Sequence, residues 1–305
     1  MTAASNSQMP SHGDHRRGVF LVLLAGGFWS IVGLVVRLID DASVWQILFY
    51  RSLALTLFLL VVISLKTRGR PMAAFRKAGS SAALGGLALS LAFFGSIAAL
   101  QNTSVANAMF LFASAPFLTA LLALPLLGER PRKATLIAMV FAALGVAVMV
   151  AEGISLGNGL GNVYAGLSAL GFALFTIALR HGRGEDMLPA VCLAGLFSSV
   201  IAAGVCVVTG DGIAVTADDA LLSCGLGVVQ LGFGLTLYTL GSKVVPAGEL
   251  ALLSMTEVVL GPIWVWLILG EGASPWTLLG GGILLAAIAG NAVTQLRHRP
   301  SPLPI

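Results

Sequence analysis

Ten apolar runs of about twenty residues, separated by short polar or charged stretches, dominate this sequence. A run of about 20 apolar residues can cross the hydrocarbon core of a bilayer as a helix, which satisfies its own backbone hydrogen bonds. The runs show none of the alternation that marks the strands of a membrane barrel. We therefore expect an all-α polytopic membrane protein with transmembrane helices near residues 18–38, 43–65, 80–100, 103–126, 134–151, 158–180, 187–209, 218–241, 245–269 and 275–295.

The composition agrees with this class. Of the 305 residues, 57% are hydrophobic and only 10% are charged, whereas a soluble domain carries about 25% charged residues. Three cysteines, Cys192, Cys206 and Cys224, are too few for a disulfide scaffold and lie in or beside apolar runs, so we expect them to be packing residues. The net charge of +4 does not indicate a nucleic-acid partner, because its distribution along the loops of a membrane protein matters more than its sum.

The first apolar run resembles an export signal because Arg16 and Arg17 precede it. At about 21 residues, however, it is longer than the 7 to 15 residues of a cleavable signal core, and nine comparable runs follow it. We expect residues 1–17 and 296–305 to be short cytoplasmic tails.

The basic residues predict the orientation. All but Arg37 and Arg51 of the 17 Lys and Arg residues fall in the termini or in the loops that follow even-numbered spans. Cytoplasmic loops carry an excess of Lys and Arg, so both termini are expected in the cytoplasm. The opposite face collects acidic residues, namely Asp40, Asp41, Glu152, Asp211, Asp218, Asp219 and Glu271.

The chain repeats itself at an offset of about 142 residues. A Leu-Gly-Glu tripeptide ends span four at 127–129 and span nine at 269–271, and Thr-Leu follows at 135–136 and 277–278. Gly-Phe pairs likewise precede Arg37 in span one and Arg180 in span six. Each half contains five spans, and because five is odd the second half must enter the membrane inverted, as in many secondary transporters.

This repeated five-helix unit resembles the EamA-type members of the drug/metabolite transporter superfamily. The resemblance implies two inverted five-helix repeats, at 18–151 and 158–295, around a central cavity lined by spans one, three, four, six, eight and nine. Spans five and ten would pack at the periphery. It also implies export of small metabolites, notably aromatic and other amino acids, across the bacterial inner membrane. The superfamily also contains carriers of nucleotide sugars and triose phosphates, so these substrates are an open alternative.

One departure from the superfamily concerns proton coupling. Its small multidrug members carry protons on a glutamate of the first helix. Here span one has Trp29 and Ser30, and span six has Ser168 and Phe172, with no acid in either. Proton coupling of that type is not expected.

The candidate substrate-binding residues are polar or aromatic side chains on the cavity-lining spans. Glu257 lies near the middle of span nine, where a charge is costly and commonly serves a transport pathway. It would recognise a substrate amino group or carry a proton; the alternative is a paired carboxyl that holds helices together. The other candidates would bind an apolar substrate side chain or its polar groups, although each could equally contact lipid or neighbouring helices: Trp29, Phe93, Phe94, Asn102, Asn107, Phe110, Phe172, Gln230, Phe233 and Tyr238.

Several further residues favour structural roles. Arg51 lies within span two, which the resemblance does not place at the cavity, so a structural pair or a snorkelling side chain is favoured over binding of a substrate carboxylate. Glu129 and Glu271 are expected to cap the helix that follows each of them. Pro116 and Pro262 are expected to kink spans four and nine.

Small residues form two further ridges at a spacing of four. They permit close helix contact within a monomer or in a homodimer. The ridges comprise Ala134, Ala138 and Ala142 in span five and Gly282, Ala286 and Gly290 in span ten.

Other classes of function fit less well. A membrane-embedded enzyme would usually need an intramembrane His, an activated Ser or a metal site, but His12, His15, His181 and His298 lie in tails or loops, and no Gly-x-Ser-x-Gly or His-Glu-x-x-His motif occurs. No span carries the polar stripe of an ion channel, and no loop is long enough for a receptor module. We expect a transporter without cofactor or metal, whose partners are a small-molecule substrate and the lipid bilayer.

Overall fold

The computed structural model of the chain describes residues 12–129, 131–155, 157–181, 187–242, 244–245 and 247–297. All regular structure within these ranges is helical. They contain ten helical segments that are long and apolar enough to cross a membrane. The expected all-α polytopic class with ten spans is confirmed.

Several spans are built from more than one helix. The first half contains α1 (His12–Ser30), α2 (Val32–Arg37), α3 (Val44–Lys66), α4 (Pro71–Asn102), α5 (Val105–Phe112), α6 (Ala115–Leu127) and α7 (Lys133–Ser155). The second half contains α8 (Gly159–His181), α9 (Leu188–Thr209), α10 (Ala217–Gly225), the π-helix η1 (Leu226–Phe233), α11 (Gly234–Gly241), α12 (Ala247–Leu269) and α13 (Pro275–Arg297).

The helices of the two halves pack against each other in matched pairs. Span three (α4) packs against span six (α8), and span one (α1) packs against span eight (α11). The repeat equates span three with span eight and span one with span six, so these two contacts are equivalent. Spans two and seven (α3 and α9) and spans five and ten (α7 and α13) pair with their own counterparts. The arrangement is that of two interlocked inverted repeats.

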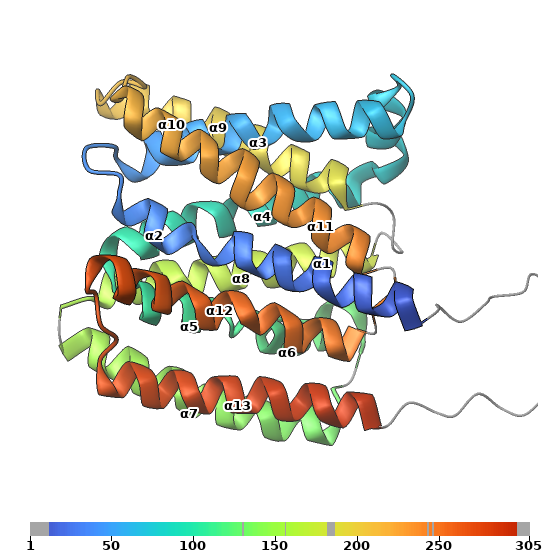
Figure 1. Cartoon of the computed structure of the whole chain (residues 1–305), viewed down its shortest axis with the longest axis vertical. Helices are drawn as coiled ribbons and strands as arrows, with labels where there is room; N and C mark the ends of the chain where they lie inside the picture. Colours follow the sequence, from blue (N-terminus) through green and yellow to red (C-terminus); the bar gives the residue numbers. More distant parts are fainter. Residues whose placement is uncertain are drawn as a thin grey trace, which may run out of the picture.

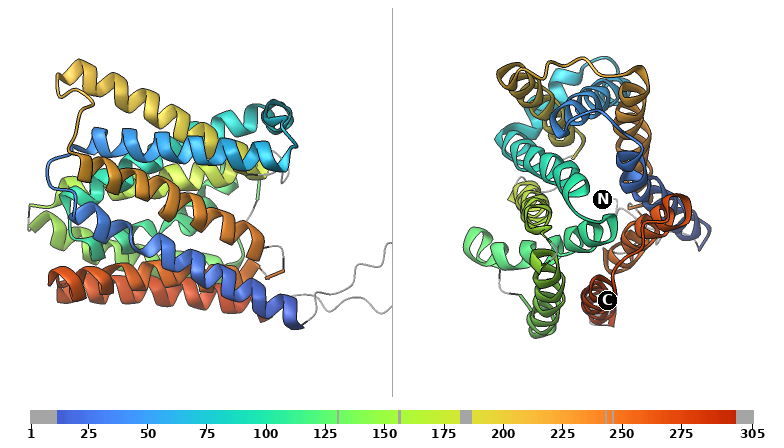
Figure 2. Two further views of the ribbon diagram at one scale, coloured as in Figure 1. Left: turned by 45° about the horizontal axis from the view of Figure 1, so that its top comes forward. Right: turned by 90° about the vertical axis from the view of Figure 1, so that its left-hand side faces the viewer.

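Helices α7 and α13 lie side by side at one edge of the bundle (Figures 1 and 2), the peripheral position that the resemblance implies for spans five and ten. Their backbones touch, because a Cβ atom built on Gly145 would lie 2.5 Å from the carbonyl oxygen of Gly280. The ridge expected on span ten is not used for this contact, since Gly282 and Gly290 have nothing within 4 Å. Of the two expected uses of this ridge, the contact within the monomer is not made with α7, and a contact in a homodimer stays a prediction.

The two proline-containing spans differ. Pro116 lacks an amide hydrogen and its ring clashes with the carbonyl four residues earlier, which is Phe112, the residue where α5 ends. Span four is therefore broken into α5 and α6. Helix α12, in contrast, continues through Pro262 to Leu269.

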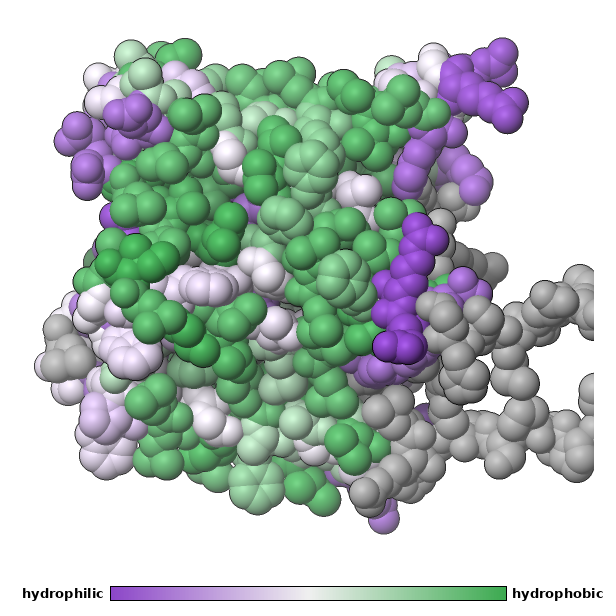
Figure 3. Space-filling view, viewed as in Figure 1, coloured by the Kyte–Doolittle hydropathy of each residue, from purple (hydrophilic) through white to green (hydrophobic). Residues whose placement is uncertain are grey.

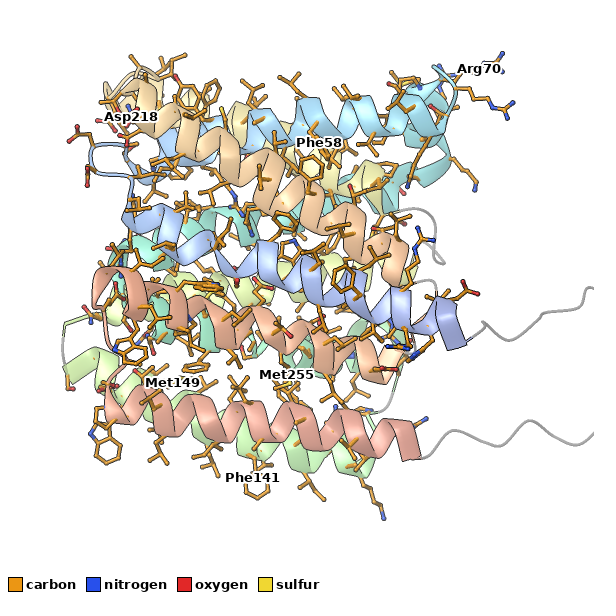
Figure 4. All side chains as sticks on the ribbon, in the orientation of Figure 1. Phe58, Arg70, Phe141, Met149, Asp218 and Met255 are labelled. Atoms are coloured by element: carbon orange, nitrogen blue, oxygen red, sulfur yellow. The ribbon has the colours of Figure 1, made fainter. Side chains whose placement is uncertain are left out.

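The surface of the bundle carries a broad apolar band between two polar ends (Figure 3). Figure 4 shows Arg70 at one end and Asp218 at the other. Helix α1 begins and α13 ends at the Arg70 end (Figure 1). This is the shape of a protein whose apolar belt faces lipid and whose ends face water.

Candidate functional site

One cross-repeat ion pair joins the end of span one to the end of span nine. Arg37 Nε lies 2.7 Å from Glu271 Oε2, and Arg37 Nη2 lies 3.3 Å from Glu271 Oε1. The same guanidinium donates to the carbonyl oxygens of Leu100 and Thr103, beside the C-terminus of α4. Glu271 Oε1 also accepts a hydrogen bond of 2.8 Å from the backbone amide of Val105, the first residue of α5. Each charge thus lies at the helix end whose dipole favours it.

A second ion pair occupies the equivalent position at the opposite end of the spans. Arg180 Nη2, at the end of span six, lies 2.8 Å from Glu129 Oε2, at the end of span four. Its side chains are 49% and 48% exposed, whereas those of Arg37 and Glu271 are 26% and 27% exposed. Equivalent ion pairs therefore join the repeats at both ends of the spans, but the Arg37–Glu271 pair is less exposed than the Arg180–Glu129 pair.

These pairs correct the expected capping role of the repeated glutamates. Glu271 does cap a helix, but it is α5 of the other repeat and not α13, the helix that follows it. Ser274 caps α13 instead, accepting a hydrogen bond of 3.0 Å from the amide of Thr277. Glu129 pairs with Arg180 of the other half. The glutamates connect the repeats because the helices nearest to them in space are not their neighbours in sequence.

Glu257 lies near the middle of α12, in a stretch whose backbone packs against α1. A Cβ atom added at Gly26 would lie 3.3 Å from the Cβ atom of Thr256 and 3.6 Å from the backbone nitrogen of Glu257. Ser254 lies three residues earlier on α12, so it shares a helix face with Glu257. The side chain of Glu257 is half-buried. An acidic group is thus held halfway through the apolar belt, between spans one and nine.

Two of the expected aromatic residues meet beside α12. The rings of Trp29 on α1 and Tyr238 on α11 have centroids 5.3 Å apart. The hydroxyl of Tyr238 interacts with the side chain of Ser254 on α12. Gln230 on η1 donates a hydrogen bond of 3.4 Å to the carbonyl oxygen of Trp29. Spans one, eight and nine therefore meet at Trp29, Gln230, Tyr238 and Ser254, and Ser254 is three residues from Glu257.

Phe93 joins the same region from span three. Its ring lies under the guanidinium of Arg51 on α3, with the Arg51 Cζ atom 5.1 Å from the ring centroid. Such a contact attracts a cation to the face of an aromatic ring. We name the six residues that line this region the central cluster: Trp29, Arg51, Phe93, Gln230, Tyr238 and Glu257.

The hydrogen-bonding capacity of the central cluster is not used up by the protein. Trp29 Nε1, Arg51 Nε, Arg51 Nη1 and Gln230 Oε1 are buried and have no hydrogen-bond partner among the residues that the structure describes. Buried polar groups are nearly always paired in folded proteins, so each exception calls for an explanation. A bound polar ligand is one.

Span eight is locally π-helical where it carries Gln230. The π-helix η1 runs over Leu226–Phe233, between two α-helical segments. Short π-helical segments within α-helices are frequent at functional sites. This feature has no sequence signature comparable to that of an amphipathic helix, and the sequence did not predict it.

The remaining sequence-predicted residues lie outside the central cluster. Phe94 stacks on Trp45, with centroids 4.6 Å apart, and meets Tyr164 edge-on at 5.6 Å. Phe110 is buried against Gly281 of α13. Phe172 and Phe233 are exposed, beside Phe175 and Phe58 respectively.

The two asparagines bind neighbouring protein groups. Asn102 donates to the carbonyl oxygen of Ala98 in its own helix. Asn107 is buried and donates to Asn162 Oδ1 at 2.5 Å and to Thr103 Oγ1 at 3.0 Å. Both side chains therefore serve contacts within the bundle.

The sequence favours a structural role for Arg51 and leaves binding of a substrate carboxylate as the alternative; the structure places its guanidinium on the ring of Phe93. The signal was available, because a charged residue in mid-span is a functional candidate by default. It was discounted since span two was expected away from the cavity.

Two inverted five-span halves, joined at both ends by ion pairs and enclosing polar groups at mid-membrane depth, define a protein of the secondary-transporter class. The chain belongs to the EamA-like transporter family, whose model matches residues 16–151 and 159–293. Both halves are thus matched separately.

Similar proteins agree with this family. Two Helicobacter pylori proteins, from strains 26695 and J99 and each described as an uncharacterized transporter, are 30% and 29% identical to this chain over 254 residues. Each alignment covers 80% of this chain and 84% of the relative. One crystal structure, described only as that of a protein, matches with a TM-score of 0.64 at 18% identity, over 93% of this chain and 100% of its own. That likeness shows the fold alone.

Proposed function

We propose that this transporter exports small amphipathic metabolites, above all aromatic and other hydrophobic amino acids, from the cytoplasm by alternating access. The central cluster carries the proposal. It combines a carboxyl group, unpartnered polar atoms and aromatic rings at mid-membrane depth. Glu257 would attract the substrate ammonium group, while Trp29 and Tyr238 would contact an apolar side chain.

Two of the cross-repeat ion pairs, Arg37–Glu271 and Arg180–Glu129, support alternating access. They lie at opposite ends of the spans, and each joins one repeat to the other. Rocking of inverted halves about a central site requires contacts that form at one end as those at the other end loosen. Both pairs are formed in this structure, and Arg37–Glu271 is the less exposed of the two.

The charge distribution supports insertion in a bacterial inner membrane with both termini in the cytoplasm. Arg70 lies at the end where α1 begins and α13 ends, and Asp218 lies at the other (Figures 1 and 4). Basic loops favour the cytoplasmic side. The Arg37 end would then face the outside.

Counterflow in liposomes tests the substrate. The purified chain, reconstituted with unlabelled phenylalanine inside, is expected to accumulate radiolabelled phenylalanine and leucine above protein-free liposomes. Triose phosphates and a nucleotide sugar are tested in parallel. Flux of a phosphorylated sugar without flux of any amino acid would contradict the proposed substrate class.

A further inference from the structure

Arg51 is a charged side chain buried within the apolar belt. It is 3% exposed and lies on α3, and neither its Nε nor its Nη1 atom forms a hydrogen bond with any described residue. Burying a charge without hydrogen-bonded partners is costly, and in proteins such groups are usually paired. The ring of Phe93 contacts one face of the guanidinium. This contact does not provide acceptors for the N–H groups, which point outward in the plane of the guanidinium.

Glu257 is not a hydrogen-bonded partner of Arg51. The two opposite charges act on each other through space, yet within the described part of the chain they form neither a hydrogen bond nor an ion pair. The central cluster therefore contains a cation and an anion that do not neutralise each other by direct contact. The arrangement is complementary to a molecule that carries one charge of each sign.

Two further polar atoms of the central cluster could bind the polar groups of such a molecule. Among the described residues, Gln230 Oε1, on a side chain that is 3% exposed, is an acceptor without a donor. Trp29 Nε1 also lacks an acceptor, but it packs against Gly234 of α11. Gln230 is connected to α1 by its bond to the carbonyl oxygen of Trp29. Gly227, three residues earlier on η1, packs against the backbone carbonyl of Arg51. The unused groups thus come from helices that touch one another.

The internal repeat distinguishes Arg51 and Glu257 from the charged residues that join the helices. Arg37 and Glu271 have counterparts in Arg180 and Glu129, so charges that hold the helices together occur twice. At the same offset of about 142 residues, the counterpart of Glu257 is Ala115, and α9 carries no basic residue. A substrate without twofold symmetry needs recognition groups that occur once. Arg51 and Glu257 meet that requirement.

We propose that Arg51 is a substrate-binding residue that receives the carboxylate of a zwitterionic substrate whose ammonium group faces Glu257. The planar guanidinium fork matches the two oxygens of a carboxylate. A single arginine opposed by a glutamate disfavours a phosphate dianion, which Glu257 would repel. The inference deepens the proposed function and rests on it, because it requires a substrate with both an amino and a carboxyl group.

Binding of three related ligands to the purified full-length protein tests the inference. Phenylalanine carries both charges, phenylalaninamide lacks the carboxylate, and 3-phenylpropionate lacks the ammonium group. For Arg51→Gln we expect phenylalanine affinity to fall by about ten- to a hundredfold, the usual range for losing a charge-assisted hydrogen-bonded contact. Phenylalaninamide, which is already weak in the wild type, should change by less than about twofold, because deleting both partners of one contact is not additive.

Three variants separate recognition from folding. Arg51→Lys keeps the charge but loses the fork, so its phenylalanine affinity should lie between those of the wild type and Arg51→Gln. Arg76→Gln removes an exposed basic residue and should bind like the wild type. Thermal unfolding in detergent confirms which variants are folded; if Arg51→Gln is not, the comparison of phenylalanine with its amide is made in Arg51→Lys.

The outcomes differ for the two proposals. If the wild type binds and transports no amino acid, the proposed substrate class is wrong, and the zwitterion site is wrong with it. If the wild type transports phenylalanine but the folded Arg51 variant loses phenylalanine and phenylalaninamide affinity equally, or neither, the proposed function stands and the role of Arg51 is overturned.

Discussion

Arg37 and Glu271, which are 234 residues apart in the sequence, form a two-point ion pair that joins the end of span one to the end of span nine. The pair also connects helix ends, since Arg37 binds carbonyl groups beside the end of α4 and Glu271 binds the first amide of α5. The Arg180–Glu129 pair repeats the connection with the halves exchanged.

The unequal exposure of these pairs predicts unequal losses of stability. Glu271→Gln leaves the half-buried Arg37 charge without its anion and should lower the free energy of unfolding by about 1 to 3 kcal/mol. Glu129→Gln removes an exposed pair and should cost about 0 to 1 kcal/mol. Apparent melting temperatures in the same detergent measure the difference. Equal shifts for the two variants would show that the ends are equally packed.

The contact between α7 and α13 predicts a contrast between two glycines. Gly145→Ala places a methyl group 2.5 Å from the carbonyl oxygen of Gly280, so the helices must separate at a cost of about 1 to 3 kcal/mol. Gly282→Ala meets nothing within 4 Å and should be neutral or stabilising by up to about 1 kcal/mol, because alanine favours the helix. Thermal unfolding distinguishes the two; a destabilised Gly282→Ala would place the helix contact on the other face of α13.

We expect Glu257→Gln to weaken recognition of the substrate amino group. The neutral amide should raise the KM for phenylalanine about tenfold or more, because a charged partner of the ammonium group is lost. In the wild type, protonation of Glu257 removes the same charge, so binding should weaken as the pH falls, and the Gln variant should lose this dependence. Tyr238 and Arg51 also face this region and keep their protonation state in the acid range. Counterflow at several pH values, with and without an imposed pH gradient, provides the measurement. Unchanged transport in Glu257→Gln would remove this residue from the mechanism.

The orientation predicts which end of the bundle can be labelled from outside the cell. In a background in which Cys192, Cys206 and Cys224 are replaced, Asp218→Cys should react with a membrane-impermeant thiol reagent added to intact cells. Arg70→Cys should react only after the cells are opened, because it lies at the other end of the bundle. A reporter at the C-terminus that is active only in the periplasm should be silent. The reverse labelling pattern would invert the topology.

The number, length and type of the spans could be predicted from the sequence, whereas the residues of the central cluster could be predicted only in part. Glu257, Trp29, Gln230, Tyr238 and Phe93 lie in it as candidates of the sequence analysis. Phe110 and Phe172 were candidates of the same kind, yet Phe110 packs on Gly281 and Phe172 is exposed. A phenylalanine is equally apolar toward lipid, a helix or a substrate, so its residue type does not reveal which way it faces.

By itself, the sequence determined that this protein crosses a membrane ten times as two related halves, because the hydropathy and charge of each segment are local properties. Only the tertiary structure decided the rotation of each helix, and with it the side chains that meet at the center. Arg51 shows the difference. Its charge in mid-span was visible in the sequence. Its donors without partners among the described residues, its contact with Phe93 and its charge interaction with Glu257 depend on how α3, α4 and α12 pack.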